Sequence, residues 1–442
     1  MRISHLKKSI IDFSTKFIKS KEYKHLRIIY LIAVISFMII LPMGKTGTGD
    51  TNSYYHAKDL ILSGSFDHLR TPLYPVFLLI TQYKIITTLF QWLIFFVSIA
   101  FLYKVLKNLK ISQRLIFAAM IIYVCHPVFT FYQNLRIPEA LGISLSCMFV
   151  YYLVAFIKTE KKSFCWIFHI IMLSLILLKP GFIFLLVISV MLLFYLFFKK
   201  RKLVLSFIFP FFFVLLSLWG YGLAMKKTYD VFSISSVSDI NLYWMLREQD
   251  KINLDSVEND EVKSFISDKI DTHYENFRYY YYEANTILYQ YGWKALHTVV
   301  QGSLTENYKS ILLDRKNLSR IKENLYGFVG RSSDSFDFRS QFKNYNIAIY
   351  LPYFDFYTLL FVLLFYFILI VKQSFTNRVV PVISILFLLY IAANLCSLVL
   401  TAPNNYGRLI VPSLSIILIV CVQCVEWFVL FIRKEERQFK LS

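Results

Sequence analysis

Long apolar runs recur along the whole chain, and they constrain its fold more than any other feature. A helix crosses a bilayer with about 20 mostly apolar residues, because it rises about 1.5 Å per residue across roughly 30 Å of hydrocarbon. The chain is 57% apolar and only 17% charged, which sets it apart from soluble globular domains. We therefore expect an all-α polytopic membrane protein with about ten transmembrane helices. The expected spans are 27–43, 84–104, 113–126, 138–157, 163–178, 180–198, 203–224, 351–371, 379–401 and 409–432.

Basic residues are concentrated between the apolar runs and at the two ends of the chain. Six such segments hold 25 basic and 5 acidic residues, which accounts for essentially the whole net charge of +20. Short loops rich in Lys and Arg stay on the cytoplasmic side of a membrane. The charge therefore predicts topology, and it does not indicate a nucleic-acid partner. We expect a multi-pass protein of the cytoplasmic membrane, with both termini in the cytoplasm and the loop after the first span outside.

The expected spans divide the chain into five regions. These are a basic cytoplasmic arm (1–26), a seven-span module with an outer loop at 43–83 (27–224), a large outer loop (225–350), a three-span region (351–432) and a cytoplasmic tail (433–442). The large outer loop has apolar positions at helical spacing and is predicted to be mainly α-helical. Its tyrosine cluster "RYYYYEANTILYQYGW" is expected at the membrane interface, where amphipathic rings are favoured, or as a platform on which sugars stack. The two runs around "LLKPGF" can also be read as one broken helix.

Ionisable residues gather in segments that this topology places outside. The stretch "KTGTGDTNSYYHAKDLILSGSFDHLRTPLYPVFLLI" contains three aspartates, and further charged residues open or close later spans. Antiparallel folding of the spans brings these groups to one depth. Charged groups near a bilayer are costly, so they tend to be paired or functional. The sequence thus predicts an outer-facing cluster, which is either a functional site or a set of structural ion pairs.

One chemistry uses this combination of groups. A carboxylate can act as a base toward an acceptor hydroxyl, whereas Arg and Lys bind phosphate oxygens and stabilise the negative charge that develops on a leaving phosphate. Transfer of a sugar from a lipid-linked phosphate needs both functions at the membrane surface.

Several short motifs occur in a characteristic order: "GDTNSYYHAKDLILSG", "RTPLYP", "IPEALG", "LLKPGFIFLL", "FSISSVSDINLYWML" and "NNYGRLIVPSLSIIL". With this order and placement the sequence resembles the GT-C glycosyltransferases of the protein mannosyltransferase and aminoarabinose transferase type (family 39-like). Those enzymes take a sugar from a polyprenyl-phosphate carrier. The resemblance covers 27–245 well and the last three spans weakly. The chain departs from the pattern in having "YGR" for "RY", Asp239 for a Gly, and no Glu directly after Asp50, which leaves the acceptor class open.

The resemblance implies a GT-C-like seven-helix module, with Asp50 as the catalytic acidic residue and Glu139 as a second one. Together with the outer-facing charges it suggests three groups of site residues. The catalytic candidates are Asp50 and Glu139, the candidates for holding donor and lipid phosphate are Arg70, Lys58, Lys179, Arg408 and Arg136, and the candidates for positioning the acceptor or the loop are Tyr54, Tyr74, Asn241 and Tyr243.

Two of these residues also have simpler interpretations. Asp50 can serve as the N-cap of a helix that begins near Tyr54, because Asp is a favoured N-cap residue. Arg70 can either contact phosphate or anchor its loop to Asp59 or Asp67.

A divalent cation is a further option, and no other cofactor is expected. Asp50, His56 and Glu139 are the candidate ligands, since imidazole and carboxylate suit zinc or manganese. No close H-x-x-x-H or D-x-D spacing supports such a site.

The sequence predicts an inverting glycosyltransferase whose partners are the bilayer, a polyprenyl-phosphate sugar donor and a glycan, lipid or protein acceptor. Two alternatives stay open. An O-antigen-type polymerase has a similar number of spans and places key arginines in its large outer loop. A lipid or polysaccharide transporter places its ionisable groups near the bilayer midplane.

Overall fold

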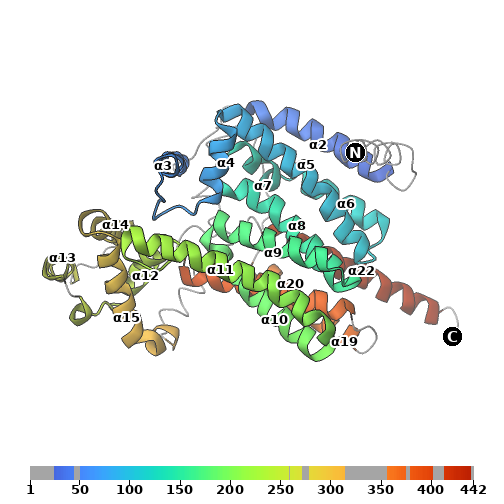
Figure 1. Cartoon of the computed structure of the whole chain (residues 1–442). Helices are drawn as coiled ribbons and strands as arrows, with labels where there is room; N and C mark the ends of the chain where they lie inside the picture. The colour runs from blue at the N-terminus through green and yellow to red at the C-terminus, as the bar shows by residue number, and fades with distance from the viewer. Residues whose placement is uncertain are drawn as a thin grey trace.

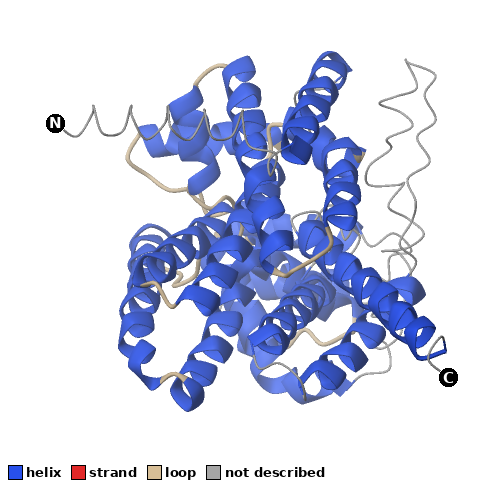
Figure 2. Ribbon diagram, turned by 90° about the vertical axis from the view of Figure 1, so that its right-hand side faces the viewer, coloured by secondary structure: helices blue, strands red, loops and turns tan. Residues whose placement is uncertain are grey.

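The structure of the chain is a computed structural model that describes residues 24–43, 50–257, 259–270, 278–313, 356–374, 379–401 and 413–439. Every regular element in these ranges is a helix, as Figure 1 and Figure 2 show. The arm before Lys24 and the residues around Arg408 lie outside the described ranges.

The helices form a main bundle and a smaller group that follows α11. The main bundle contains α2 (Lys24–Ile40), α4 (Leu73–Thr81), α5 (Lys84–Asn108), α6 (Gln113–Cys125), α8 (Pro138–Thr159), α9 (Lys162–Leu178), α10 (Leu185–Lys199), α11 (Val204–Tyr229), α19 (Phe356–Ser374), α20 (Val379–Thr401) and α22 (Leu414–Phe439). The smaller group, called the outer bundle here, contains α12 (Val237–Glu248), α13 (Asp260–Ile270), α14 (Arg278–Tyr291) and α15 (Trp293–Leu313). A separate helix, α3 (Thr51–Leu62), follows α2 in the sequence and lies beside α4 at one end of the main bundle (Figure 1).

A helix is present at each of the ten places where the sequence predicts a span. Five helical stretches are long and apolar enough to cross a membrane: 84–108, 138–159, 180–199, 201–229 and 414–431. Four more predicted spans hold shorter apolar helices, and α2 is a 17-residue helix. The regular structure of the described residues is therefore all helical, and these five helices indicate a membrane protein.

The outward face of the main bundle is itself apolar. Along α11, large hydrophobic side chains such as Phe209, Phe212 and Trp219 are exposed, and α2 exposes Leu31 and Met38. A water-soluble protein rarely exposes apolar patches of this extent. Lipid contact explains why both helices keep apolar residues on the side that faces away from the bundle.

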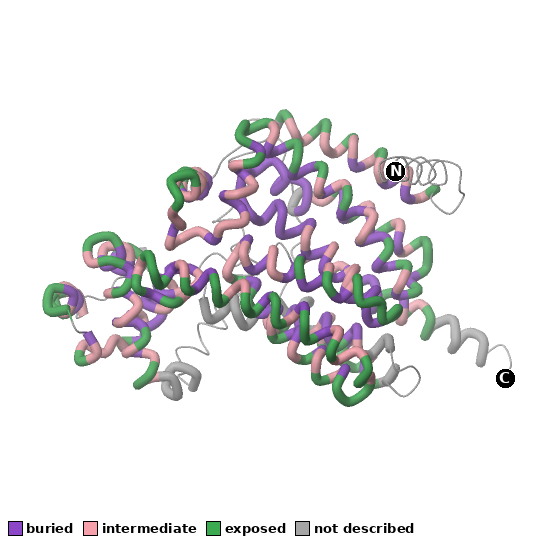
Figure 3. Tube along the Cα trace, viewed as in Figure 1, coloured by how far each residue is buried: buried purple, intermediate pink, exposed green. Residues whose placement is uncertain are grey.

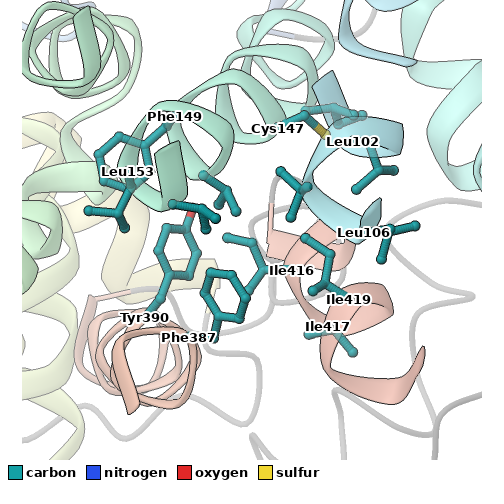
Figure 4. Packing of buried hydrophobic residues seen from close by; sticks show 14 of the residues in the cluster. Leu102, Leu106, Cys147, Phe149, Leu153, Phe387, Tyr390, Ile416, Ile417 and Ile419 are labelled. Atoms are coloured by element: carbon teal, nitrogen blue, oxygen red, sulfur yellow. The ribbon is translucent and has the colours of Figure 1, made fainter. Parts of the chain in front are cut away.

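The centre of the main bundle is α8, which packs against α5, α9, α20 and α22. Figure 4 shows this packing, with Leu106 of α5, Phe149 of α8, Tyr390 of α20 and Ile416 of α22 meeting in one layer. The ring of Phe184 lies 5.0 Å from that of Tyr390. The three C-terminal helices therefore complete the core of the first seven.

The alternative of one broken helix around "LLKPGF" is wrong. α9 ends at Leu178, and a short 3-10 turn leads into α10. At the far end of α10, the Lys200 ammonium pairs with Glu160, which lies next to the start of α9, at 2.5 Å. The two helices are therefore separate and run in opposite directions, with Lys179 at the turn between them.

The two ends of the main bundle differ in composition. At one end lie the α5–α6, α8–α9 and α10–α11 connections, which are rich in Lys and Arg and contact one another: Lys158 donates to the carbonyl of Asn108, and Lys200 donates to that of Ile157. We call this the basic end. α3 and the outer bundle lie at the opposite end, called the α3 end (Figure 1).

The outer bundle has its own hydrophobic core, as the alternation of buried and exposed positions in Figure 3 indicates. Ile240, Ile266, Ile287 and Val299 are fully or almost fully buried in it, and each such side chain contributes about 1.5–3 kcal/mol when removed from water. α14 turns into α15 at Gly292, whose φ of +89° is a conformation that favours glycine.

Candidate functional site

Asp50 immediately precedes α3 at the α3 end. The helix begins at Thr51, and the Asp50 carbonyl accepts hydrogen bonds from Tyr54 N (3.3 Å) and Ser53 Oγ (2.7 Å). Its carboxylate makes no capping hydrogen bond to the helix and is 34% exposed. Asp50 thus occupies the N-cap position that the sequence suggested, while its side chain points to another partner.

That partner is Arg70, at the end of the loop that joins α3 to α4. Its Nη2 lies 3.0 Å from Asp50 Oδ1, its Nε donates to Ser53 Oγ at 2.9 Å, and its guanidinium lies 4.5 Å from the centre of the Tyr54 ring. The anchoring of Arg70 to Asp59 or Asp67 is not seen among these contacts, because Asp67 Oδ1 accepts the backbone N–H of Arg70 and forms a local turn instead. Arg70 therefore fixes the carboxylate of Asp50 and the start of α3 at once.

Glu139 and Lys179 form a second acid–base pair at the same end. Glu139 is in the first turn of α8, directly after Pro138, where the helix dipole stabilises a carboxylate. Its side chain is fully buried, and its Oε1 lies 2.7 Å from Lys179 Nζ. Proline at the first position of a helix and an acidic residue after it are the sequence signals for the helix start that carries Glu139.

Arg136, which shortly precedes α8, contacts the first turns of α3. Its carbonyl accepts a hydrogen bond from Thr51 Oγ1 at 3.4 Å, and its Nη1 donates to the Tyr55 hydroxyl at 3.1 Å. Two consecutive tyrosines of α3 therefore each face an arginine, Tyr54 facing Arg70 and Tyr55 facing Arg136.

Tyr74 is the buried floor beneath these groups. Its ring meets that of Tyr54 edge to face at 5.2 Å, and its hydroxyl donates to Gln91 at 2.9 Å. Burial raises the pKa of Tyr74 well above its usual value, and the nearby phenols and Glu139 add to this while Arg136 opposes it. Tyr74 therefore lies within electrostatic reach of both Glu139 and Arg136. We call the eight residues that converge here the α3 cluster: Asp50, Tyr54, Tyr55, Arg70, Tyr74, Arg136, Glu139 and Lys179.

Sequence reasoning missed Tyr55 of the cluster and two residues of α5 beneath it, Gln91 and Trp92. Gln91 accepts from Tyr74 and donates to the carbonyls of Gln133 and Leu135, and Trp92 donates to Asn134 at 2.8 Å. A glutamine in the middle of an apolar run was the available signal, because a buried amide needs partners.

The loop between α3 and α4 is docked on the outer bundle. His68 Nδ1 lies 3.0 Å from Ser236 Oγ, Ser236 N donates to the His68 carbonyl at 2.8 Å, and Ser235 Oγ donates to the Leu69 carbonyl at 2.9 Å. Tyr229 donates to the Phe66 carbonyl at 2.5 Å. The segment "FSISS" therefore holds the loop that carries Arg70.

Other predicted site residues lie apart from the α3 cluster. Tyr243 is buried in the outer bundle, where its hydroxyl donates to Glu283 at 3.2 Å, and Asn241 is half-buried on the same helix. Lys58 pairs with Asp59 at 3.2 Å and lies 5.3 Å from the centre of the Tyr55 ring, so it borders the cluster. Arg408 lies outside the described residues.

Asp239, where the family pattern has glycine, has a structural partner. Its Oδ2 accepts a hydrogen bond from Trp293 at 2.6 Å and lies 3.1 Å from His297 Nδ1. The carboxylate therefore joins α12 to α15.

The proposed metal ligands are not brought together. Within the described part of the chain, no three His, Cys, Asp or Glu side chains are grouped closely enough to hold a metal ion. His56 is exposed on α3, and Glu139 is committed to Lys179. The chemistry that these residues present is that of one accessible carboxylate beside several cations.

No family model matches the sequence, and no curated protein is significantly similar to it. The interpretation of the α3 cluster rests on the geometry of its own residues.

Proposed function

We propose that the chain is a GT-C-like membrane glycosyltransferase with ten spans, both termini in the cytoplasm and the α3 end outside. It moves a sugar from a polyprenyl-phosphate donor to an acceptor at the outer face of the cytoplasmic membrane, with inversion. The observation that carries this proposal is the partly exposed carboxylate of Asp50, held by Arg70 beside further cationic side chains.

The two acidic residues take different roles in this reaction. Asp50 is accessible, so its carboxylate orients the acceptor hydroxyl and accepts its proton as the oxygen attacks the anomeric carbon. Glu139 is fully buried against Lys179, so it acts as a positioning residue that holds the Lys179 ammonium toward the cluster. This division assigns the base to the residue that a substrate can reach.

The basic residues of the α3 cluster hold the departing lipid phosphate. Arg70 and Arg136 contact α3, Lys179 is held by Glu139 at the same end of the bundle, and Lys58 borders the cluster. Charge-assisted hydrogen bonds from Arg and Lys to phosphate oxygens stabilise the negative charge that develops as the glycosidic bond breaks. The phosphate leaves as the dianion of the lipid carrier, and the acceptor proton passes to Asp50.

The two alternative functions, an O-antigen-type polymerase and a lipid or polysaccharide transporter, find less support among the described residues. Arg247, an arginine of the large outer loop, is fully buried and paired with Glu283 at 3.0 Å, which is a structural contact. A transporter would keep charges near the bilayer midplane, whereas the buried carboxylates and guanidinium groups described here lie at the bundle ends or in the outer bundle. His169, buried in α9, is the ionisable exception.

Replacement of Asp50 by Asn tests the proposal. Cells that lack the protein should accumulate an undecaprenyl-phosphate sugar, and lipid extraction with mass spectrometry would identify that sugar. With this donor and the purified protein in nanodiscs, Asp50→Asn should reduce transfer about 10²–10⁴-fold, the usual contribution of a general base. The matched control is Asp59→Asn, on the same helix and exposed, which should retain transfer. Unimpaired transfer by Asp50→Asn, or no accumulated donor, would overturn the assignment.

A further inference from the structure

α14 carries an exposed row of tyrosines that neither the core nor the α3 cluster uses. Its buried face consists of apolar side chains such as Ala284 and Ile287, together with Tyr280, which lies over the guanidinium of Arg247 at 5.2 Å. The opposite face is formed by tyrosines that are between 43% and 67% exposed. We call these four the tyrosine ladder: Tyr279, Tyr281, Tyr282 and Tyr289.

The ladder consists of three adjacent tyrosines at the start of α14 and of Tyr289, which lies further along the helix and next to the docked loop. The rings of Tyr279 and Tyr281 each lie within 6.4 Å of the ring of Tyr282, and the ring of Tyr289 lies 6.4 Å from that of His68. His68 is two residues before Arg70 on the docked loop. The pKa of Tyr289 is raised by burial, then by Tyr281 and Asp67, and lowered by Arg70, so Tyr289 lies within electrostatic reach of that arginine.

We propose that the tyrosine ladder binds the acceptor, and that the acceptor is a glycan chain whose sugar rings stack on the tyrosines while its end reaches Asp50. This inference rests on the proposed function. Tyr282 and Tyr289 are seven residues apart on one face, about 10 Å along the helix, which a short chain of pyranose rings can span. The ladder thus selects an extended, hydroxylated acceptor and directs it to the base.

The chemistry of the ladder favours a sugar chain over the other occupants. A phenol offers an apolar face to the C–H face of a sugar and a hydroxyl to its hydrogen bonds. Helices that lie on a membrane carry Lys or Arg beside Trp, Phe or Leu, whereas the exposed face of α14 between 279 and 291 is neutral, with Asn285 and Thr286 between the tyrosines. Between 279 and 291 this face has no Lys or Arg to bind a phosphate group.

Direct binding of oligosaccharides to the full-length protein in nanodiscs tests the proposal. The probes are neutral tetra- to hexasaccharides of glucose, galactose and N-acetylglucosamine, followed by saturation-transfer NMR. The double variant Tyr282→Leu/Tyr289→Leu keeps apolar volume but loses the rings, so its affinity should fall about tenfold or more. Tyr282→Phe/Tyr289→Phe keeps stacking and should stay within about threefold. Tyr83→Leu is the matched control, because Tyr83 is 66% exposed but lies on the α4–α5 turn.

The outcomes separate this proposal from the proposed function. Binding that survives in Asp50→Asn but is lost in the double Leu variant supports the ladder. Absence of oligosaccharide binding, or equal binding by the double Leu variant, overturns it even when transfer from the lipid donor persists. Brominated lipids could quench the tyrosine fluorescence of the wild type more than that of the double Leu variant, while the two proteins bind oligosaccharides equally. This result would assign the ladder to the membrane surface and also overturn the proposal. If the protein binds oligosaccharides through the ladder but transfers no sugar from the lipid donor, the proposed glycosyltransferase activity is refuted. The ladder would then remain a sugar-binding site without the role of acceptor site.

Discussion

Two acid–base pairs lie at the α3 end, and they differ in what surrounds them. Asp50 and Arg70 are held by a short helix and a docked loop, and the Asp50 carboxylate is partly open to solvent. Glu139 and Lys179 are held by the ends of two long helices, and the Glu139 carboxylate is closed off. The two pairs therefore carry the same charges but differ in exposure, since the Asp50 carboxylate can be reached from solvent and the Glu139 carboxylate cannot.

The difference teaches that accessibility and scaffold, rather than residue type, separate the two roles. A partly exposed ion pair contributes only about 0–1 kcal/mol to stability, so Asp50 and Arg70 can exchange partners with a substrate at small cost. A buried pair is costly to break, because the remaining charge has no compensation. A carboxylate that must receive a proton from a substrate belongs to the first kind.

The largest effect on stability is expected from breaking the buried pair. Glu139→Ala should destabilise the protein by about 3–5 kcal/mol, because the Lys179 ammonium loses its carboxylate in a desolvated place. The thermal midpoint in detergent measures this loss. The double variant Glu139→Leu/Lys179→Met should recover most of it, since replacement of both charges by apolar groups is often nearly neutral. A single variant as stable as the wild type would show that the pair is not structural.

The sequence predicted much of this contrast, but not its decisive part. The apolar runs located ten helices of the main bundle, all of those described there except the nine-residue α4, and "IPE" located Glu139 at a helix start, because both signals are local. Which cation meets which carboxylate depends on how α3 lies against α4 and α8, and no local pattern encodes this. The burial of Tyr243 could not be predicted for the same reason, since the partner of its hydroxyl, Glu283, is 40 residues away in the sequence.

A smaller effect is expected from the accessible pair, and it should fall on activity. Arg70→Lys keeps the charge but cannot contact Asp50, Ser53 and the Tyr54 ring at once, because lysine lacks the planar fork of arginine. Transfer should drop about 10–100-fold, the cost of roughly 1.4–2.7 kcal/mol of lost positioning. The thermal midpoint should change little. Lys263→Arg, at an exposed pair with Asp255 in the outer bundle, is the matched control, and a large loss of stability in Arg70→Lys would place this pair with the buried one.

The smallest effect concerns pH, and it should reach only the accessible pair. His68 docks the loop that carries Arg70, and burial lowers its pKa from 6.5, with His56 acting in the same direction and Asp67 opposing it. Because the docked histidine binds a proton less readily than the undocked one, docking is fully stable above pH 6.5 and weakens as the pH falls through and below that value. Hydrogen exchange of residues 63–72, corrected for intrinsic rates, should show protection falling a few-fold, and at most about tenfold, between pH 6.5 and 5.5.

His68→Asn separates docking from titration, because the amide keeps a hydrogen-bonding group near Ser236 but does not change its charge in this range. Its protection should be independent of pH over the same interval. Amides around Lys179 should show no comparable loss in either protein, since the buried pair lies on the ends of α8 and α9. Equal pH sensitivity of both segments would mean that acid loosens the whole α3 end, and the two pairs would then share one scaffold.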